Sequence, residues 1–114
     1  MESHIEIQKV HKQVTVRVSG ETVAQSSSTL LLLEGSLPPR HYFPREDVNM
    51  DLLTPSQSVS HCPYKGDANY WSFKAADHYS EDVVWCYETP IEEMSSIAGM
   101  LCFYDERVDL KTTG

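Results

Sequence analysis

The chain of 114 residues is long enough for one domain with a single hydrophobic core. Its 17 acidic and 9 basic residues give a formal net charge of −8, which argues against nucleic-acid and anionic-membrane binding, because both depend on basic patches. The sequence starts with no signal-peptide pattern, and its longest apolar run, residues 30–33, is too short to cross a bilayer. We therefore expect a cytoplasmic monomer or homodimer that binds neither nucleic acid nor membrane.

The first half of the chain shows the alternation of apolar and polar residues that is typical of half-buried strands. Residues 5–8 and 14–18 carry this pattern, and the turn formers Ser19 and Gly20 predict a hairpin that returns over residues 22–25. The apolar run at residues 30–33 suits a strand that is covered on both faces.

After a break at residues 35–39, which contain two adjacent prolines, the pattern is less regular. Residues 40–65 read as a loop-rich segment with a short strand at 50–53. Their Pro44 predicts one helical turn over residues 44–47. Further strands are expected at residues 69–74, 83–87, 99–104 and 108–111, because these runs are rich in β-branched and aromatic residues.

One further helix has a start signal, with Thr89 as the N-cap, Pro90 as the first helical residue and Glu92 completing a capping box. The following Gly99 and the strand after it keep this helix short. The predicted class is thus all-β, a single domain over residues 1–114 with antiparallel strands and one or two short helices.

The cysteines and histidines argue against a bound metal. The three cysteines are an odd number, they form no CxxC pair, and the five histidines show no HxH or HxxxH spacing. A disulfide framework and a structural zinc site are therefore not expected, and we predict reduced thiols, no metal and no cofactor.

Three segments combine charged residues, aromatic residues and a proline or glycine: residues 40–48, 61–71 and 85–90. Such a mixture favours a polar site lined by aromatic side chains. In the second segment, Gly66 permits a tight backbone whose N–H groups converge on an anion, and Lys65 adds a positive charge. The alternative is an ordinary solvated turn before the next strand, since glycine and aspartate are common turn formers. The spacing is not that of a P-loop.

Other candidates also have two interpretations. Arg45 is a good bidentate partner for a carboxylate or phosphate, and Asp47 either orients it or acts as a general base; the alternative is a surface salt bridge. Cys62, next to His61, is either a nucleophile or a small buried side chain. Tyr70, Tyr87 and the two tryptophans either stack around a planar ligand or belong to the core.

Five ordered motifs resemble a known family, the domain of unknown function DUF427, over nearly the whole chain. They are GETVAQS at residues 20–26, YFPREDV at 42–48, CPYKGDANYW at 62–71, WCYETP at 85–90 and IAGMLCFY at 97–104. The resemblance implies a small β-tent, or Mss4-like, fold. Zinc-binding β-tent proteins use paired CxxC motifs, which this chain lacks. The family also carries a nucleotidyltransferase-like label, but here Gly35 and Ser36 are not followed by the alternating carboxylates that hold catalytic cations.

Our leading hypothesis is a domain that binds a small anionic or polar metabolite, with Lys65 and Arg45 contacting the anion and therefore lying on the same side of the molecule. The expected lining is Arg45, Asp47, Cys62, Lys65, Gly66, Tyr70 and Tyr87. One alternative is an enzyme that uses Cys62 as a nucleophile or Asp47 as a base. Another is a protein-interaction module that presents the proline-containing loop at residues 37–39.

Overall fold

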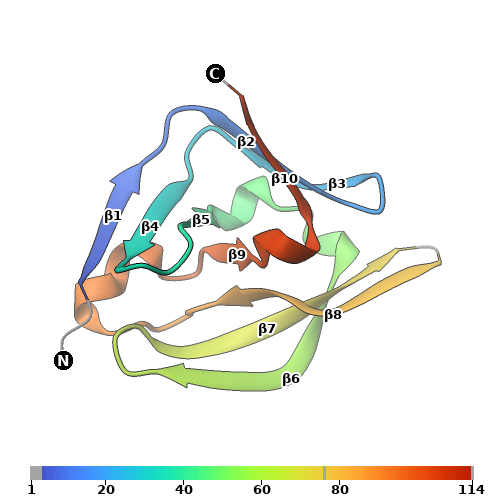
Figure 1. Cartoon of the computed structure of the whole chain (residues 1–114). Coiled ribbons are helices and arrows are strands. Elements are labelled where there is room, and N and C mark those ends of the chain that lie inside the picture. The colour runs from blue at the N-terminus through green and yellow to red at the C-terminus, as the bar shows by residue number, and fades with distance from the viewer. Residues whose placement is uncertain (1–3, 76, 114) are drawn as a thin grey trace.

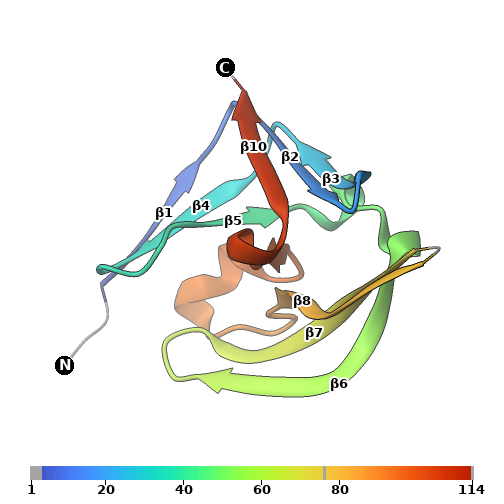
Figure 2. The ribbon, with the colours of Figure 1, turned by 45° about the vertical axis from the view of Figure 1, so that its right-hand side comes forward.

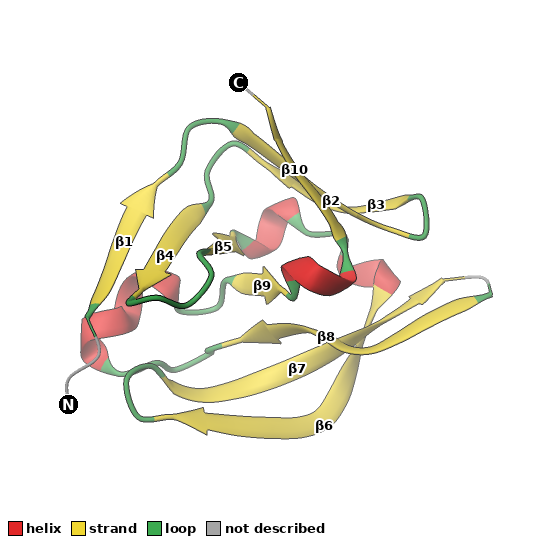
Figure 3. Cartoon of the chain, viewed as in Figure 1, coloured by secondary structure: helices red, strands yellow, loops and turns green. Residues whose placement is uncertain are grey.

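The computed structural model describes residues 4–75 and 77–113, which form two antiparallel β-sheets linked by loops and short 3-10 helices (Figure 1 and Figure 3). The strands are β1 (Ile5–Lys9), β2 (Gln13–Val18), β3 (Glu21–Ser26), β4 (Leu30–Glu34), β5 (Arg40–Phe43), β6 (Leu53–Cys62), β7 (Gly66–Ala75), β8 (His78–Cys86), β9 (Leu101–Phe103) and β10 (Asp109–Thr113). The 3-10 helices are η1 (Arg45–Asp47), η2 (Met50–Leu52), η3 (Glu92–Ile97) and η4 (Asp105–Arg107). The predicted all-β class is confirmed.

The larger sheet has seven strands in the order β1-β4-β5-β9-β8-β7-β6, and the smaller has three in the order β10-β2-β3. Figure 1 and Figure 2 show that β1 and β4 form one side of the molecule, that β6, β7 and β8 form another, and that β5 and β9 lie between them. The smaller sheet lies above β5 and β9 in these views. The large sheet is therefore strongly bent rather than flat.

The central strands of the large sheet bury side chains on both faces. Successive residues of a strand point to opposite faces, so on β5 Phe43 enters one cluster of buried residues and Tyr42 enters another. The first cluster lies between the two sheets and includes Val14, Val16 and Val18 of β2. The second includes Trp85 of β8 and Ile97 of η3. These two clusters are called the inter-sheet core and the outer core below.

Several predicted elements are confirmed. Ser19 and Gly20, both with positive φ, make the turn between β2 and β3, and η1 supplies the helical turn expected after Pro44. The strands expected at residues 5–8, 14–18, 22–25 and 30–33 correspond to β1 to β4, and those expected later overlap β7 to β10.

Three predictions about the middle of the chain were wrong. Residues 40–65 are not loop-rich, because they contain β5 and the ten-residue β6. The short strand expected at residues 50–53 is the 3-10 helix η2, and β6 begins only at Leu53. The helix expected to start after Thr89 is the 3-10 helix η3, whose N-cap is Ile91. Tertiary contacts explain the late start: the Ile91 N–H donates to the Lys65 carbonyl at 2.9 Å, which holds this segment extended against the β6–β7 turn.

Candidate functional site

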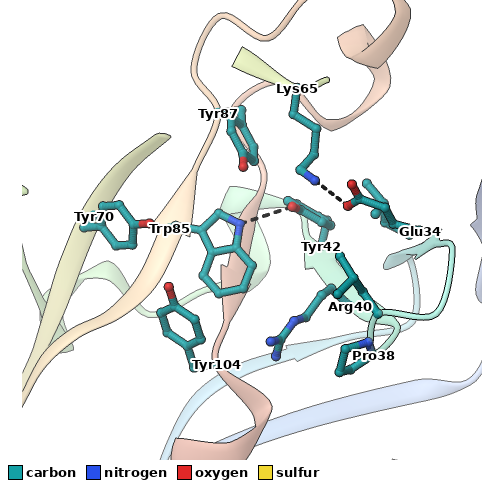
Figure 4. A pocket seen from close by; sticks show the side chains of 11 residues that line it. Glu34, Pro38, Arg40, Tyr42, Lys65, Tyr70, Trp85, Tyr87 and Tyr104 are labelled. Atoms are coloured by element: carbon teal, nitrogen blue, oxygen red, sulfur yellow. Dashed lines mark hydrogen bonds and ion pairs between the residues drawn. The ribbon is translucent and has the colours of Figure 1, made fainter. Parts of the chain in front are cut away.

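A pocket of about 240 Å³ opens on the outer-core face of the large sheet (Figure 4). Its side chains come from β4, β5, β7, β8, the loop at residues 35–39, the β6–β7 turn and the residue before η4. Three groups of residues line it: the aromatic Tyr42, Tyr70, Trp85, Tyr87 and Tyr104, the charged Glu34, Arg40 and Lys65, and the apolar Leu32, Leu37 and Pro38. A pocket lined mainly by aromatic and apolar side chains with a few charged groups is a natural candidate for a small-molecule site.

Trp85 organises the aromatic wall. Its indole Nε1–H donates to the Tyr42 hydroxyl at 3.1 Å, and the two rings meet edge to face with centroids 6.5 Å apart. On its other side Tyr104 packs against Trp85 with a centroid distance of 4.5 Å. The ring orientations are thus fixed by packing and a hydrogen bond before any ligand arrives, which lowers the entropic cost of binding.

Three tyrosine hydroxyls of the pocket have raised pKa values and are neutral at physiological pH. Burial is the main cause in each case: it raises the pKa of Tyr42 and of Tyr87 above the usual range, and it raises the pKa of Tyr104 to about 12, with a further upward contribution from Tyr70. Each of these hydroxyls can therefore both donate and accept a hydrogen bond. The net charge of the pocket must come from its other side chains.

Those charges occur as two ion pairs. Lys65 Nζ lies 2.6 Å from Glu34 Oε1, and the two side chains are only 11% and 14% exposed. Arg40 Nη1 lies 2.9 Å from Glu106 Oε1, and the Arg40 guanidinium also stacks 5.4 Å from the Trp85 ring centre and 5.6 Å from that of Tyr104. The Arg40 hydrogen bond lowers the pKa of Glu106, so this carboxylate is ionised at neutral pH. Both cations of the pocket are thus already matched by carboxylates.

Three of the predicted site residues are brought together in this pocket. Lys65, Tyr70 and Tyr87 all line it, and Lys65 is buried although it lies in a turn. Gly66 adopts a positive φ of 122°, and a Cβ at this position would lie 3.2 Å from the Cα of Pro90, so both the backbone conformation and the space favour glycine. The convergent N–H groups expected here are not arranged around an open space, since the Lys65 N–H donates to the Cys62 carbonyl at 3.1 Å.

Arg45 and Asp47 do not line this pocket. Arg45 stacks 5.3 Å from the ring centre of Trp71, which belongs to the inter-sheet core, and pairs with Glu88 at 3.4 Å. Asp47 ends η1, which contacts β3. The structure therefore separates Arg45 from Lys65 across the large sheet, and the expectation that both contact one anion has to be corrected. The second cation of the pocket is Arg40.

Cys62 packs against the outer core beside the pocket rather than lining it. The neighbouring His61 is exposed, and its Nδ1 lies 2.7 Å from Asp67 Oδ1. Adjacent strand residues point to opposite faces, so the sequence neighbours His61 and Cys62 do not form a thiol–imidazole pair on β6.

Sequence reasoning missed Glu34, Arg40, Tyr42 and Tyr104. A signal for two of them was present: Arg40 and Tyr42 are two residues apart, so on a strand they share a face. Without β5 in the prediction, this spacing had no structural meaning. Glu34 and Tyr104 each follow an apolar run and occupy the end of a strand or the residue after it, where a polar group is unremarkable.

Comparison with known proteins gives the family. The model of the domain of unknown function DUF427 matches residues 6–114. The chain belongs to this family. No curated protein matches it. In the part of the chain that the structure describes, no three or more His, Cys, Asp and Glu side chains gather into a potential metal site, and no helix has the length and apolar character needed to span a membrane.

Proposed function

We propose that this DUF427 domain binds a small polar metabolite in the aromatic pocket. The observation that carries the proposal is the composition of that pocket: five aromatic side chains, four of them with hydroxyls, surround a space of about 240 Å³ together with Lys65 and Arg40. Aromatic faces bury the apolar part of a ligand, and the fixed polar groups set its orientation. The volume lies below the range of about 300–1,000 Å³ that accommodates drug-sized ligands, so it favours a compact molecule.

The loop at residues 35–39 supports this function over a protein-interaction module. Leu37 is exposed, as a contact residue would be, but Leu37 and Pro38 also form part of the pocket wall. We therefore assign this loop to the rim of the binding site. For the setting, we retain the β-tent arrangement implied by the family resemblance and a cytoplasmic location, which suits the three free cysteines.

The test compares two arginines that have similar surroundings on opposite faces of the sheet. Arg40 stacks on Trp85 and pairs with Glu106 in the pocket, whereas Arg45 stacks on Trp71 and pairs with Glu88 outside it. Ligand-observed NMR with a panel of amino acids, monosaccharides, small carboxylates and phosphate would first identify binders. Arg40→Gln should then weaken binding by about tenfold or more, and Arg45→Gln should change it less than about twofold. Equal effects of the two substitutions, or no binder in the panel, would contradict the proposal.

A further inference from the structure

The two ion pairs of the pocket differ in how far water reaches them. The Lys65 and Glu34 side chains are 11% and 14% exposed, whereas Glu106, the partner of Arg40, is 61% exposed. Figure 4 shows the Lys65–Glu34 pair beside Tyr42, at the opposite end of the labelled residues from Tyr104. The pocket therefore contains a positive and a negative group side by side, largely shielded from solvent.

This arrangement places a charge requirement on any ligand that engages the pair. The Lys65 ammonium has three N–H donors, so an anionic ligand can contact it while Lys65 remains paired with Glu34. Such a ligand, however, brings a second negative charge close to the Glu34 carboxylate, and like charges repel strongly where water is largely excluded. A ligand with only a cationic group meets the same repulsion from Lys65. A ligand that carries both charges can place each of them beside the opposite charge of the pair.

We propose that the ligand of this pocket is a small zwitterion with its carboxylate and its ammonium on neighbouring atoms, as in a free α-amino acid. This inference rests on the proposed function and specifies the ligand class for the same pocket. The ligand carboxylate binds the Lys65 ammonium, and the ligand ammonium binds the Glu34 carboxylate. The remainder of the ligand lies toward Trp85 and Tyr70, whose rings complete the wall.

The aromatic side chains favour the cationic half of such a ligand as well. The faces of tyrosine and tryptophan rings attract ammonium groups, most strongly where water is excluded. The pocket already shows this preference internally, because the Arg40 guanidinium lies over both Trp85 and Tyr104. An ammonium bound to Glu34 would lie near Tyr42, which is beside the Lys65–Glu34 pair (Figure 4).

The experiment compares ligands that differ only in charge. Each free amino acid is titrated into the protein by isothermal calorimetry, and the tightest binder is compared with its N-acetyl derivative, which is anionic, and its amide, which is cationic. We expect both derivatives to bind at least about tenfold more weakly than the amino acid. If either derivative binds as tightly as the amino acid, or if no amino acid binds, the zwitterion inference is wrong. In that case the proposed function would still be supported if a sugar or phosphate binds and if Arg40→Gln, but not Arg45→Gln, weakens its binding.

A pair of double variants separates this role of the ion pair from a purely structural one. Lys65→Met with Glu34→Gln removes both charges, so the discrimination among the amino acid and its two derivatives should fall to less than about threefold. Arg45→Met with Glu88→Gln removes an ion pair outside the pocket and should leave the discrimination unchanged. Circular dichroism confirms that both variants are folded. Undiminished discrimination in the first variant would overturn the assignment to Lys65 and Glu34.

Discussion

The Lys65–Glu34 pair offers a quantitative test of how strongly the pocket depends on charge matching. In Lys65→Met the apolar stem of the side chain keeps its packing while the ammonium is lost. Breaking a fully buried pair costs about 3–5 kcal/mol in the free energy of unfolding, and an exposed pair contributes at most about 1 kcal/mol. With side chains 11% and 14% exposed, we expect a loss of about 2–4 kcal/mol.

Urea denaturation at pH 7, followed by circular dichroism, measures this loss directly. Glu34→Gln and the double variant with Lys65→Met complete a double-mutant cycle. Because the second substitution removes the charge that the first leaves buried, the double variant should lose less stability than the sum of the single ones, by about 1–3 kcal/mol. A loss below about 1 kcal/mol for Lys65→Met, together with a coupling near zero, would show that the pair behaves like a surface salt bridge. The charge argument for the ligand would then lose its physical basis.

Three further predictions concern the thiols, the β6–β7 turn and the acid range. Burial raises the pKa of Cys86 to about 11 and that of Cys102 well above its usual range, so Ellman's reagent should modify only Cys62 in the folded protein and all three thiols in urea. Gly66→Ala should lower the melting temperature and reduce the free energy of unfolding by about 1–3 kcal/mol. The reason is that φ is 122° and the new Cβ would lie 3.2 Å from a proline Cα. An unchanged melting temperature would mean that the turn relaxes freely. Interactions with Ser56 and, to a smaller extent, with Ser58 lower the pKa of Asp82. Its stabilising effect is therefore present above the unfolded pKa of about 4 and is lost as pH falls through the folded value. The stability difference between the wild type and Ser58→Ala should accordingly shrink below about pH 4, and a difference that grows there would contradict this account.

The sequence was most informative where a strand buries only one face. Residues 14–18 alternate strictly, and Val14, Val16 and Val18 are the buried side chains of β2. It was least informative for β6, which contains Pro55 and a run of polar residues. As the last strand of the large sheet, β6 pairs on one edge only with a described strand, β7, and at such an edge proline is tolerated and polar side chains face water. Such a strand lacks the periodic burial on which sequence-based prediction depends.

The sequence predicted the kinds of residue that line the candidate site better than it predicted which individual residues line it. The mixed segments at residues 40–48, 61–71 and 85–90 each contribute to the pocket, but Arg40 rather than Arg45 enters it. The two arginines are separated by the end of β5 and the turn of η1. Which of them faces the outer core depends on where the strand begins. That position is set by the pairing of β5 with β4 and β9, and β9 lies far away in the sequence.

The location of the pocket follows from how the two faces of the large sheet are covered. The smaller sheet covers the inter-sheet face and buries a continuous apolar core there. The outer face is covered by η3 over only part of its area, and the sequence places side chains with apolar bodies and polar ends in the remainder. Burial raises the pKa values of Tyr42, Tyr87 and Tyr104 further above the neutral range, so their hydroxyls carry no charge there. The charge recognised in the pocket is therefore defined by Lys65, Glu34 and Arg40 with its partner, so ligand selectivity should depend on charge pairing.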